Sequence, residues 1–505
     1  MPERMGAVSP AYLARELLRA VGGRVRPVAR LEESLYRSYM RTFGRRFASR
    51  QRAKIARFLG VTPEKVVSCD HHEAHAYSAY FGSPFRGRDA LILTLDGEGD
   101  FHAATVSVAR GERIERIAAT PMSASLGVLY SALTRYLGMT PLEHEYKIMG
   151  LAPYAQEKYF RGLYAEVRSL VRIDPARPLT FASAFDLHRA EPWMEKHLRR
   201  IRFDVVAGAF QKATEDLIAE WALSCVRATG IRRVCCAGGV FMNVKANKRI
   251  LELDGVDELF IFPSSGDEST PIGAAYAWIR RDGAGEIAPI ADVYWGPEAS
   301  EAEIDRALSA LPAGRYRVER PPALAAAVAR LLAEGKIVAV LRGRMEFGAR
   351  ALGNRSILAD PSDRTVVERI NQAIKGRDFW MPFAATVLEE RSDDYIVNPK
   401  RHYAPYMIQS FDTTARARSA LAAAIHPYDK TLRPQVLRKE WNPPYHAIIS
   451  EFEKLSGIGA VLNTSFNLHG YPIVMTAADA LQVLADSGLE YLVLGDRLVS
   501  KVKSG

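Results

Sequence analysis

Residues 344–356 of this chain read Arg344-Met345-Glu346-Phe347-Gly348-Ala349-Arg350-Ala351-Leu352-Gly353-Asn354-Arg355-Ser356. The segment follows an apolar run at 336–341 that is typical of a buried strand. Guanidinium groups bind phosphate oxygens in pairs, and glycine lets the backbone approach an anion closely. Because Phe347 and Leu352 belong against a core, the segment is not an ordinary solvated basic loop. We therefore expect a phosphate-binding loop directly after a strand.

The composition indicates a globular protein. The chain has 505 residues, 48% hydrophobic and 25% charged, which suits two or three domains. No run approaches the ~18 apolar residues of a membrane span, so we expect no membrane partner. The cysteines give no disulfide framework, which favours structural thiols and a cytoplasmic location. The net charge of +10 suits nucleic acid or an anionic small substrate, and because the basic residues are spread out, we expect no nucleic-acid partner.

Apolar periodicity and glycine positions predict an α/β fold in two parts. In the first part we expect helices at 11–18 and 55–59, a helix from 71, a hairpin with strands 90–95 and 103–108, a helix at 206–229, and strands at 233–237 and 259–261. After a Gly-, Ala- and Pro-containing linker at 283–300, the pattern restarts with a helix at 324–332, the strand at 336–341 and a helix at 364–374. We place the domains at 1–295 and 296–505.

The turn at residues 70–75 reads Asp70-His71-His72-Glu73-Ala74-His75 and begins with a helix-capping pattern. His71 and His75 then share one helical face, as two metal ligands do. Asp96 in the hairpin turn and Asp267 after a strand could add carboxylates. This set favours Fe(II), with Mn or Zn as the other candidates. A pair of half-buried histidines without a metal is the alternative.

Glycine and cationic turns suggest a place for a nucleotide. Gly238 and Gly239 end a predicted strand, and Asn243 precedes a helical run, so a nucleotide could approach the helix N-terminus. A plain tight turn is the competing interpretation of Gly-Gly. In the second part, cationic or amide side chains occur at several turns, and they include Lys375, Arg433, Ser465 and Asn467. Together with residues 344–356, these turns predict a cationic pocket for a polyphosphate.

Five motifs between residues 70 and 475 resemble those of the O-carbamoyltransferases of the nodulation and antibiotic-tailoring group, which includes nebramycin and cephamycin carbamoylation enzymes. The motifs are His71-His72-Glu73-Ala74-His75, Tyr146-Lys147-Ile148-Met149-Gly150-Leu151-Ala152-Pro153-Tyr154, Ala237-Gly238-Gly239-Val240-Phe241-Met242-Asn243, residues 344–356, and Asn463-Thr464-Ser465-Phe466-Asn467.

This resemblance implies an actin-like first domain, of the kind used in tRNA threonylcarbamoyl transfer, and a second domain resembling threonylcarbamoyl-adenylate synthase. It implies that the second domain makes carbamoyl-adenylate from carbamoyl phosphate and ATP with Mg²⁺. The first domain would then pass the carbamoyl group to a hydroxyl acceptor, and the chain could act as a homodimer. The implied metal ligands are His71, His75, Asp96 and Asp267. The implied catalytic residues are Lys375, Arg433, Arg350 and Arg355, and the implied cofactor-binding residues are Gly238, Gly239, Asn243, Ser465, Asn467 and Lys147.

One departure from the family leaves alternatives open. Family members begin with a glycine, aspartate and histidine hairpin, whereas this chain starts in helical sequence. We expect either that an upstream in-frame segment encodes the hairpin or that the acceptor site is altered. The alternative functions are a nonenzymatic nucleotide-binding regulator of the same fold and a transferase of tRNA modification or hydrogenase maturation. The maturation proteins carry zinc-finger cysteines, and no Cys-x-x-Cys occurs here. The acceptor could be a sugar, an aminoglycoside, a lipid or a polyketide.

Overall fold

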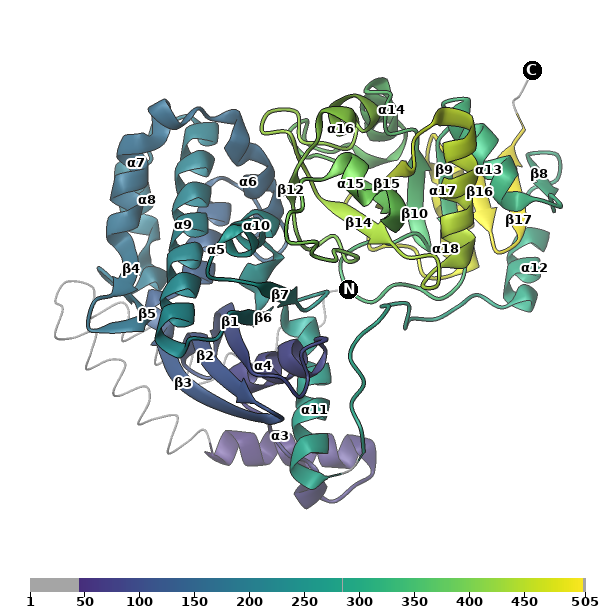
Figure 1. Cartoon of the computed structure of the whole chain (residues 1–505). Helices are drawn as coiled ribbons and strands as arrows, with labels where there is room; N and C mark the ends of the chain where they lie inside the picture. The colour runs from purple at the N-terminus through teal and green to yellow at the C-terminus, as the bar shows by residue number, and fades with distance from the viewer. Residues whose placement is uncertain (1–44, 284, 503–505) are drawn as a thin grey trace.

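The computed structural model describes residues 45–283 and 285–502. They form two α/β regions, each built around its own sheet, which confirms the predicted fold class (Figure 1). The expected boundary at 295/296 lies between the two sheets and stays a prediction. The expected helix at 11–18 and the expected lack of an opening hairpin concern residues 1–44, which lie outside the described part. Within that part, no helix is long and apolar enough to cross a membrane.

The first sheet has five strands in the order β3-β2-β1-β6-β7. They are β1 (Ala90–Gly99), β2 (His102–Arg110), β3 (Arg113–Pro121), β6 (Arg233–Ala237) and β7 (Glu258–Ile261). β1 to β3 are antiparallel neighbours, whereas β6 runs parallel to β1 and β7 parallel to β6. An antiparallel meander continued by parallel strands is the arrangement expected of an actin-like domain. Because β1, β6 and β7 are parallel, the segments that follow them meet at one edge.

Helices cover both faces of this sheet (Figure 1). On one face, α4 (His71–Phe81) packs against α11 (Thr270–Asp282), and the other face carries α5 (Leu126–Tyr136) and α9 (Phe203–Thr229). α4 begins at the predicted cap, where the Glu73 amide donates to Asp70 Oδ1 at 2.8 Å. α11 approaches α4 closely because residue 273 is glycine, and a Cβ there would lie 1.7 Å from the Ala74 oxygen. Helices outside these layers are α3 (Arg45–Leu59), α6 (Glu145–Leu151), α7 (Glu157–Leu170), α8 (Glu191–His197) and α10 (Val244–Glu252).

The second sheet has eight strands in the order β14-β11-β15-β10-β9-β16-β17-β8. They are β8 (Tyr316–Glu319), β9 (Val338–Leu341), β10 (Arg355–Ala359), β11 (Ala384–Leu388), β14 (Pro434–Leu437), β15 (Ala460–Ser465), β16 (Tyr491–Leu494) and β17 (Arg497–Lys501). Alternate residues of β9 face opposite ways, as the strand period requires. Val338 and Val340 contact α13 (Leu324–Ala333) and α17 (Pro443–Ser456), whereas Ala339 and Leu341 face α12 (Glu301–Ser309), α14 (Thr365–Ile370) and α18 (Ala477–Asp486).

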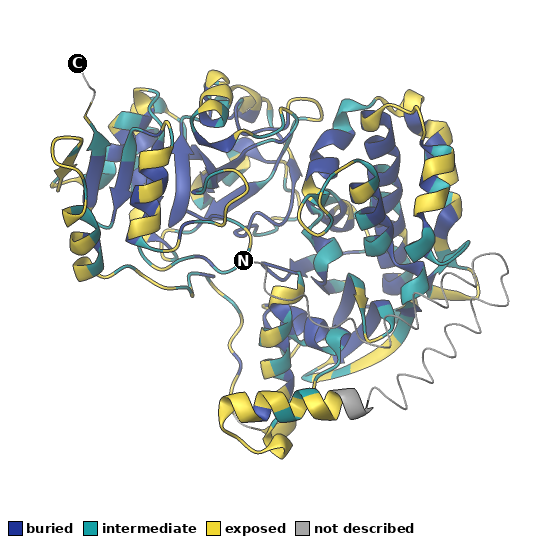
Figure 2. Ribbon diagram, turned by 180° about the vertical axis from the view of Figure 1, so that it is seen from behind, coloured by how far each residue is buried: buried dark blue, intermediate teal, exposed yellow. Residues whose placement is uncertain are grey.

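The two regions share an apolar core. The cluster built on the first sheet extends into residues of the second region, among them Leu352, Tyr406 and Phe411, all nearly without exposure. The central strands of both sheets are buried in Figure 2, and the exposed surface lies on outer helical faces, on loops and on the edge strands β3 and β8. Because apolar packing joins the regions, any cavity between them has walls in a fixed relation.

Candidate active site

The four expected metal ligands lie together: His71 and His75 on α4, Asp96 near the end of β1, and Asp267 in the turn that follows β7. The Nε2 atoms of His71 and His75 are 3.2 Å apart. Asp96 Oδ2 lies 3.6 Å and 3.0 Å from these two nitrogens, and Asp267 Oδ1 lies 3.7 Å and 3.6 Å from them. Ligand atoms ~2.0–2.2 Å from a common ion stand roughly 3.0–3.6 Å from one another. The four side chains therefore fit one divalent transition-metal ion.

Neighbouring groups orient these ligands. Ser269 Oγ contacts His75 Nδ1 at 3.1 Å, which turns Nε2 toward the cluster. The amide of Gly239 donates to Asp96 Oδ2 at 3.1 Å, so the glycine turn after β6 supports the carboxylate. Burial opposes ionisation of Asp96, but hydrogen bonds from His71 and His75 outweigh it and lower its pKa. Asp96 is therefore held as the carboxylate that a metal requires.

The third histidine of the motif has a structural role. His72 is fully buried, and its ring nitrogens contact Thr94 Oγ1 at 2.8 Å and the carbonyl oxygen of His102 at 3.0 Å. Burial lowers the pKa of His72 to about 4. Its ring is therefore neutral at pH 7 and locks α4 onto the hairpin β1–β2.

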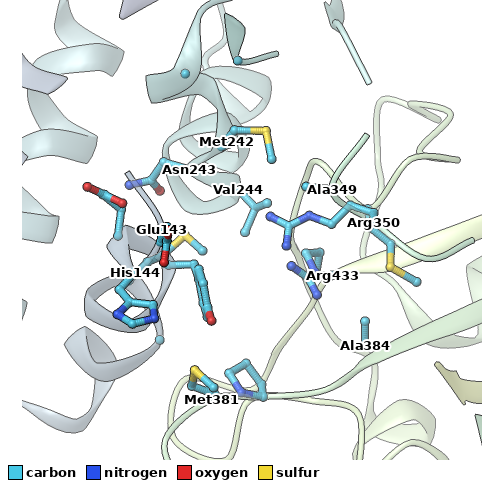
Figure 3. Close-up of a pocket in the computed structure, with 18 of the residues that line it drawn as sticks. Glu143, His144, Met242, Asn243, Val244, Ala349, Arg350, Met381, Ala384 and Arg433 are labelled. Carbon is cyan, nitrogen blue, oxygen red and sulfur yellow. The ribbon is translucent and has the colours of Figure 1, made fainter. Parts of the chain in front are cut away.

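A cavity of about 800 Å³ lies between the two regions and joins the metal cluster to the predicted cationic pocket. Its wall from the first region includes Asp96, Gly239, Asn243 and Asp267. Its wall from the second region includes residues of several turns, namely Arg350, Lys375, Arg377, Arg433, Ser465 and Asn467. In Figure 3, the side chains of Arg350 and Arg433 extend toward each other, and Glu143 and His144 lie across the cavity from them.

Three arginines of this wall lack an acidic partner. Within the described ranges, no carboxylate forms an ion pair or hydrogen bond with Arg350, Arg377 or Arg433, and the buried Nε of Arg350 has no partner. Burial lowers the pKa of Arg350 to about 10. Burial and the charges of Arg350 and Arg377 lower the pKa of Arg433 well below its ordinary value. Clustered cations of this kind are stabilised when an anion enters, and guanidinium groups suit phosphate.

Lys375 joins the same wall through neutral partners. It ends a π-turn that continues α14, and its Nζ donates to Ser465 Oγ at 3.2 Å and to Asn467 Oδ1 at 2.5 Å. Burial and the nearby charge of Arg377 lower its pKa strongly. The structure thus brings Lys375, Ser465 and Asn467 together at the cavity, although they are up to 92 residues apart in sequence.

Arg355 does not reach the cavity, contrary to the expectation from the resemblance. It is fully buried at the start of β10, and its guanidinium donates to the carbonyl oxygens of Asn354 at 2.9 Å and Gly343 at 3.1 Å. The loop closes around Glu346, whose Oε1 accepts from the amides of Leu352 at 2.7 Å and Asn354 at 2.8 Å. Arg355 and Glu346 therefore shape the loop that presents Arg350.

Two other expected cofactor-binding residues lie behind the cavity wall. Gly238 has φ 110°, and a Cβ there would lie 2.3 Å from the Leu95 oxygen, so only glycine allows β6 to end this close to β1. Lys147 is buried, and its Nζ lies 3.1 Å from Asp378 Oδ2. Gly239 and Asn243 do line the cavity. Lys147 instead connects α6 to the turn that carries Arg377.

Some cavity residues are absent from the sequence-based site, among them Arg377, Lys245, Tyr130, Glu143 and His144. The sequence gives an indication of Arg377, because this residue follows Lys375 in a Lys-Gly-Arg turn that is typical of an anion site. Lys245 lies inside a helical run, where lysine is usually solvated, so no pattern singles it out. Cavity residues without a sequence pattern, such as Lys245, can be identified only from the packing of the two regions in the structure.

Sequence profiles of known families match both regions. The profile described as Carbamoyltransferase N-terminus matches residues 35–276, and that described as Carbamoyltransferase C-terminus matches residues 329–501. The chain belongs to the carbamoyltransferase family. This confirms the family resemblance and places the chain in a family of transferase enzymes.

Curated relatives of this carbamoyltransferase include nodulation proteins. Nodulation protein NolNO of Sinorhizobium fredii is 34% identical over 453 residues, covering 87% of this chain and 65% of the relative. Nodulation protein NolO of Bradyrhizobium diazoefficiens is 34% identical over 445 residues, with 86% and 79% covered. The chain therefore spans just under two thirds of NolNO. The crystal structure of full-length HypF in its phosphate- and nucleotide-bound form aligns at a TM-score of 0.27 and 17% identity, over 44% of this chain and 37% of HypF, which is too distant to support an argument.

Proposed function

We propose that the chain is an ATP-dependent O-carbamoyltransferase that forms carbamoyl-adenylate and passes the carbamoyl group to a hydroxyl acceptor. The observation that carries the proposal is the cavity shared by the two regions. One of its walls carries the ligand set for a divalent cation, and the other carries three unpaired arginines and Lys375. The chain belongs to a carbamoyltransferase family, and its cavity could hold both a metal and a polyphosphate. These two observations together favour activation of the carbamoyl group by ATP.

Activation would take place at the cationic wall. Water releases phosphate from carbamoyl phosphate and leaves carbamate, whose oxygen attacks the α-phosphorus of ATP. The bond from that phosphorus to the bridging oxygen breaks, and pyrophosphate leaves, with Mg²⁺ accompanying the nucleotide. Arg350, Arg377 and Arg433 offset the negative charge that builds up on the leaving group, and they do so in a cavity where water does not screen them fully. Lys375, Ser465 and Asn467 provide further donors beside them.

Transfer would take place nearer the metal cluster. His71, His75, Asp96 and Asp267 would hold a divalent ion, with Fe(II) the first candidate, and such an ion supplies Lewis-acid polarisation of an oxygen. Gly239 and Asn243 line the cavity here and would contact the adenylate. The acceptor hydroxyl oxygen bonds to the carbamoyl carbon, the bond from that carbon to the AMP oxygen breaks, and the hydroxyl proton is lost to a base. AMP is a good leaving group, whereas carbamate itself is a poor electrophile.

The test is mass spectrometry of the full chain incubated with Mg-ATP and carbamoyl phosphate. We expect carbamoyl-adenylate, together with inorganic phosphate and pyrophosphate in equal amounts. A nonenzymatic nucleotide-binding regulator would release neither, and ATP binding without these products would therefore overturn the proposal. An Arg317→Met variant, which removes an exposed arginine outside the cavity, serves as the matched control.

A further inference from the structure

Polar contacts between the two regions occur beside the unpaired arginines. Lys147 of α6 forms an ion pair with Asp378, with 3.1 Å between Nζ and Oδ2. Lys245 of α10 forms an ion pair with Asp429 and donates to Thr431 Oγ1 at 3.0 Å. The two lysines belong to the first region, and their partners belong to the second.

Each acidic partner lies next to an arginine of the cavity wall. Asp378 directly follows Arg377, and residues 376–383 form neither helix nor strand beyond a short turn. Asp429 precedes Arg433 by four residues in a turn that leads through β13 (Thr431–Leu432), a strand of only two residues. The backbone at Arg377 therefore lies outside regular secondary structure, whereas Arg433 is the single residue between β13 and β14. The ion pairs to the first region add a restraint to both segments, and at Arg377 the local backbone supplies little of its own.

These ion pairs are better shielded than ordinary surface pairs. Lys147 and Asp378 expose 11% and 34% of their side chains, and Lys245 and Asp429 expose 12% and 29%. A third contact supports the second turn, because His426 Nε2 lies 2.9 Å from the oxygen of Gly150 in α6. Shielded pairs of this kind hold geometry better than exposed ones, whose side chains move freely.

The arginines need such a restraint because they repel one another. Arg350, Arg377 and Arg433 face one cavity, and among the described residues no carboxylate forms an ion pair with them, although Glu268 of the opposite wall acts on Arg350 from a distance. Repulsion alone would drive the guanidinium groups of Arg377 and Arg433 apart. Arg377 has one packing contact, with its guanidinium carbon 5.2 Å from the centre of the Phe383 ring. Anchoring of the adjacent backbone would oppose this separation in the absence of a ligand.

We propose that Lys147 and Lys245 are positioning residues, which fix Arg377 and Arg433 through Asp378 and Asp429 so that the polyphosphate site of the second region is completed by the first. This inference rests on the proposed function for the identity of the ligand. It assigns to Lys147 a role behind the wall rather than a contact with the cofactor. It also makes adenylate formation dependent on both regions, instead of a property of residues 296–505 alone.

The test exploits the sign of a charge change. Asp378→Asn and Asp429→Asn each remove a negative charge near the anion site, so electrostatics alone would strengthen pyrophosphate binding. If the two aspartates instead position the arginines, the same substitutions should weaken pyrophosphate binding. We expect the dissociation constant for pyrophosphate, measured by titration calorimetry on the full chain, to rise about tenfold in each variant. The rate of pyrophosphate release from ATP and carbamoyl phosphate should fall about 100-fold, since small misplacements are costly in catalysis.

Further variants separate positioning from a loss of folding. Lys147→Arg keeps the charge and should retain most of the binding, whereas Lys147→Met should behave as Asp378→Asn does. Lys454→Met removes a lysine from an exposed pair with Glu451 and should leave binding unchanged. Thermal unfolding midpoints, recorded for every variant, report whether each one is folded.

The outcomes distinguish the two proposals. Unchanged or tighter pyrophosphate binding in folded Asp378→Asn and Asp429→Asn variants would overturn the positioning role. Weakened binding in these variants, in a chain that never forms carbamoyl-adenylate, would support positioning and overturn the proposed function. A wild-type chain that binds no pyrophosphate would overturn both.

Discussion

The two walls of the cavity differ in the charges of their side chains. In the first region, two imidazoles and two carboxylates converge within 4.8 Å, so groups that can carry opposite charge face one another. In the second region, three guanidinium groups converge, and that region adds no carboxylate to the lining of the cavity. The first arrangement is suited to a cation that replaces protons, and the second is suited to a polyanion. The contrast shows that one cavity can hold two sites, because each wall attracts a ligand of the charge opposite to its own excess.

The largest effect that we predict concerns the cationic wall. Arg433→Ala should lower the rate of pyrophosphate release by about 100-fold or more, because a lost charge-assisted phosphate contact costs roughly 2–5 kcal/mol. A coupled pyrophosphate assay with ATP and carbamoyl phosphate measures it. The exposed-arginine variant Arg317→Met should keep the wild-type rate. Full activity in Arg433→Ala would show that this wall does not bind the leaving group.

The second-largest effect that we predict concerns metal binding by the wall that carries the histidines and aspartates. Wild-type protein prepared anaerobically with Fe(II) should hold one ion per chain, and His75→Ala should weaken metal affinity by at least about 100-fold, since loss of a direct ligand should exceed the effect of losing an outer-shell group. Elemental analysis after dialysis measures the content. His188→Ala, which changes a histidine outside the cluster, should keep the ion. A metal-free wild type would contradict the contrast between the walls.

The free energy of unfolding without ligand distinguishes an arginine that lacks an acidic partner from one that has such partners. Arg433→Met removes a cation that only other cations face, so we expect the free energy of unfolding to rise by about 1 kcal/mol. Arg497→Met removes a buried arginine that pairs with Glu301 at 2.8 Å, Asp305 at 2.5 Å and Asp496 at 2.9 Å, and should lower it by about 1–3 kcal/mol. Urea unfolding without phosphate compares the two. Equal destabilisation by both changes would mean that Arg433 has a hidden partner.

These contrasts also show what the sequence could predict. The metal ligands were accessible because His71 and His75 lie four residues apart in a capped helix and because Asp96 and Asp267 follow predicted strands. Parallel strand ends meet, so the four residues converge as expected. The sequence pattern does not indicate β10, and in the structure Arg355 starts this strand and its guanidinium donates to carbonyl oxygens of its own loop.

Residues that act across the regions were harder to find. Lys147 belongs to a recognised motif, yet only the packing of α6 against the turn at Asp378 shows what its ammonium group contacts. Lys245 lies in an ordinary helical run and gives no signal at all in the sequence. Local patterns report on contacts within an element or between neighbouring strand ends. They carry little information about an ion pair between residues 184 positions apart.

The smallest effect that we predict involves a histidine with two acidic partners. Burial alone would lower the pKa of His188, but Asp186 and Glu98 raise it to about 9. Because this folded-state value exceeds the unfolded value of ~6.5, the stabilisation is full below about pH 6.5 and is lost as the pH rises through about 9. Since Glu98 is 40% exposed, we expect only about 1 kcal/mol.

Unfolding of wild type and His188→Gln at pH 6 and pH 9.5 measures this contribution. The difference in free energy of unfolding between the two proteins should be largest at pH 6 and nearly vanish at pH 9.5. A difference that stays constant with pH would assign the effect to packing and not to the two ion pairs. Such a result would show that Asp186 and Glu98 do not stabilise the charged form of His188.

The most direct test of the two-walled cavity is a crystal structure of the full chain grown with Mn²⁺ and pyrophosphate, with anomalous data collected for manganese. We predict an anomalous peak held by His71, His75, Asp96 and Asp267. We also predict pyrophosphate bound by Arg350 and Arg433 in the same cavity. Manganese bound away from the four ligands, or pyrophosphate bound away from the arginines, would contradict the account.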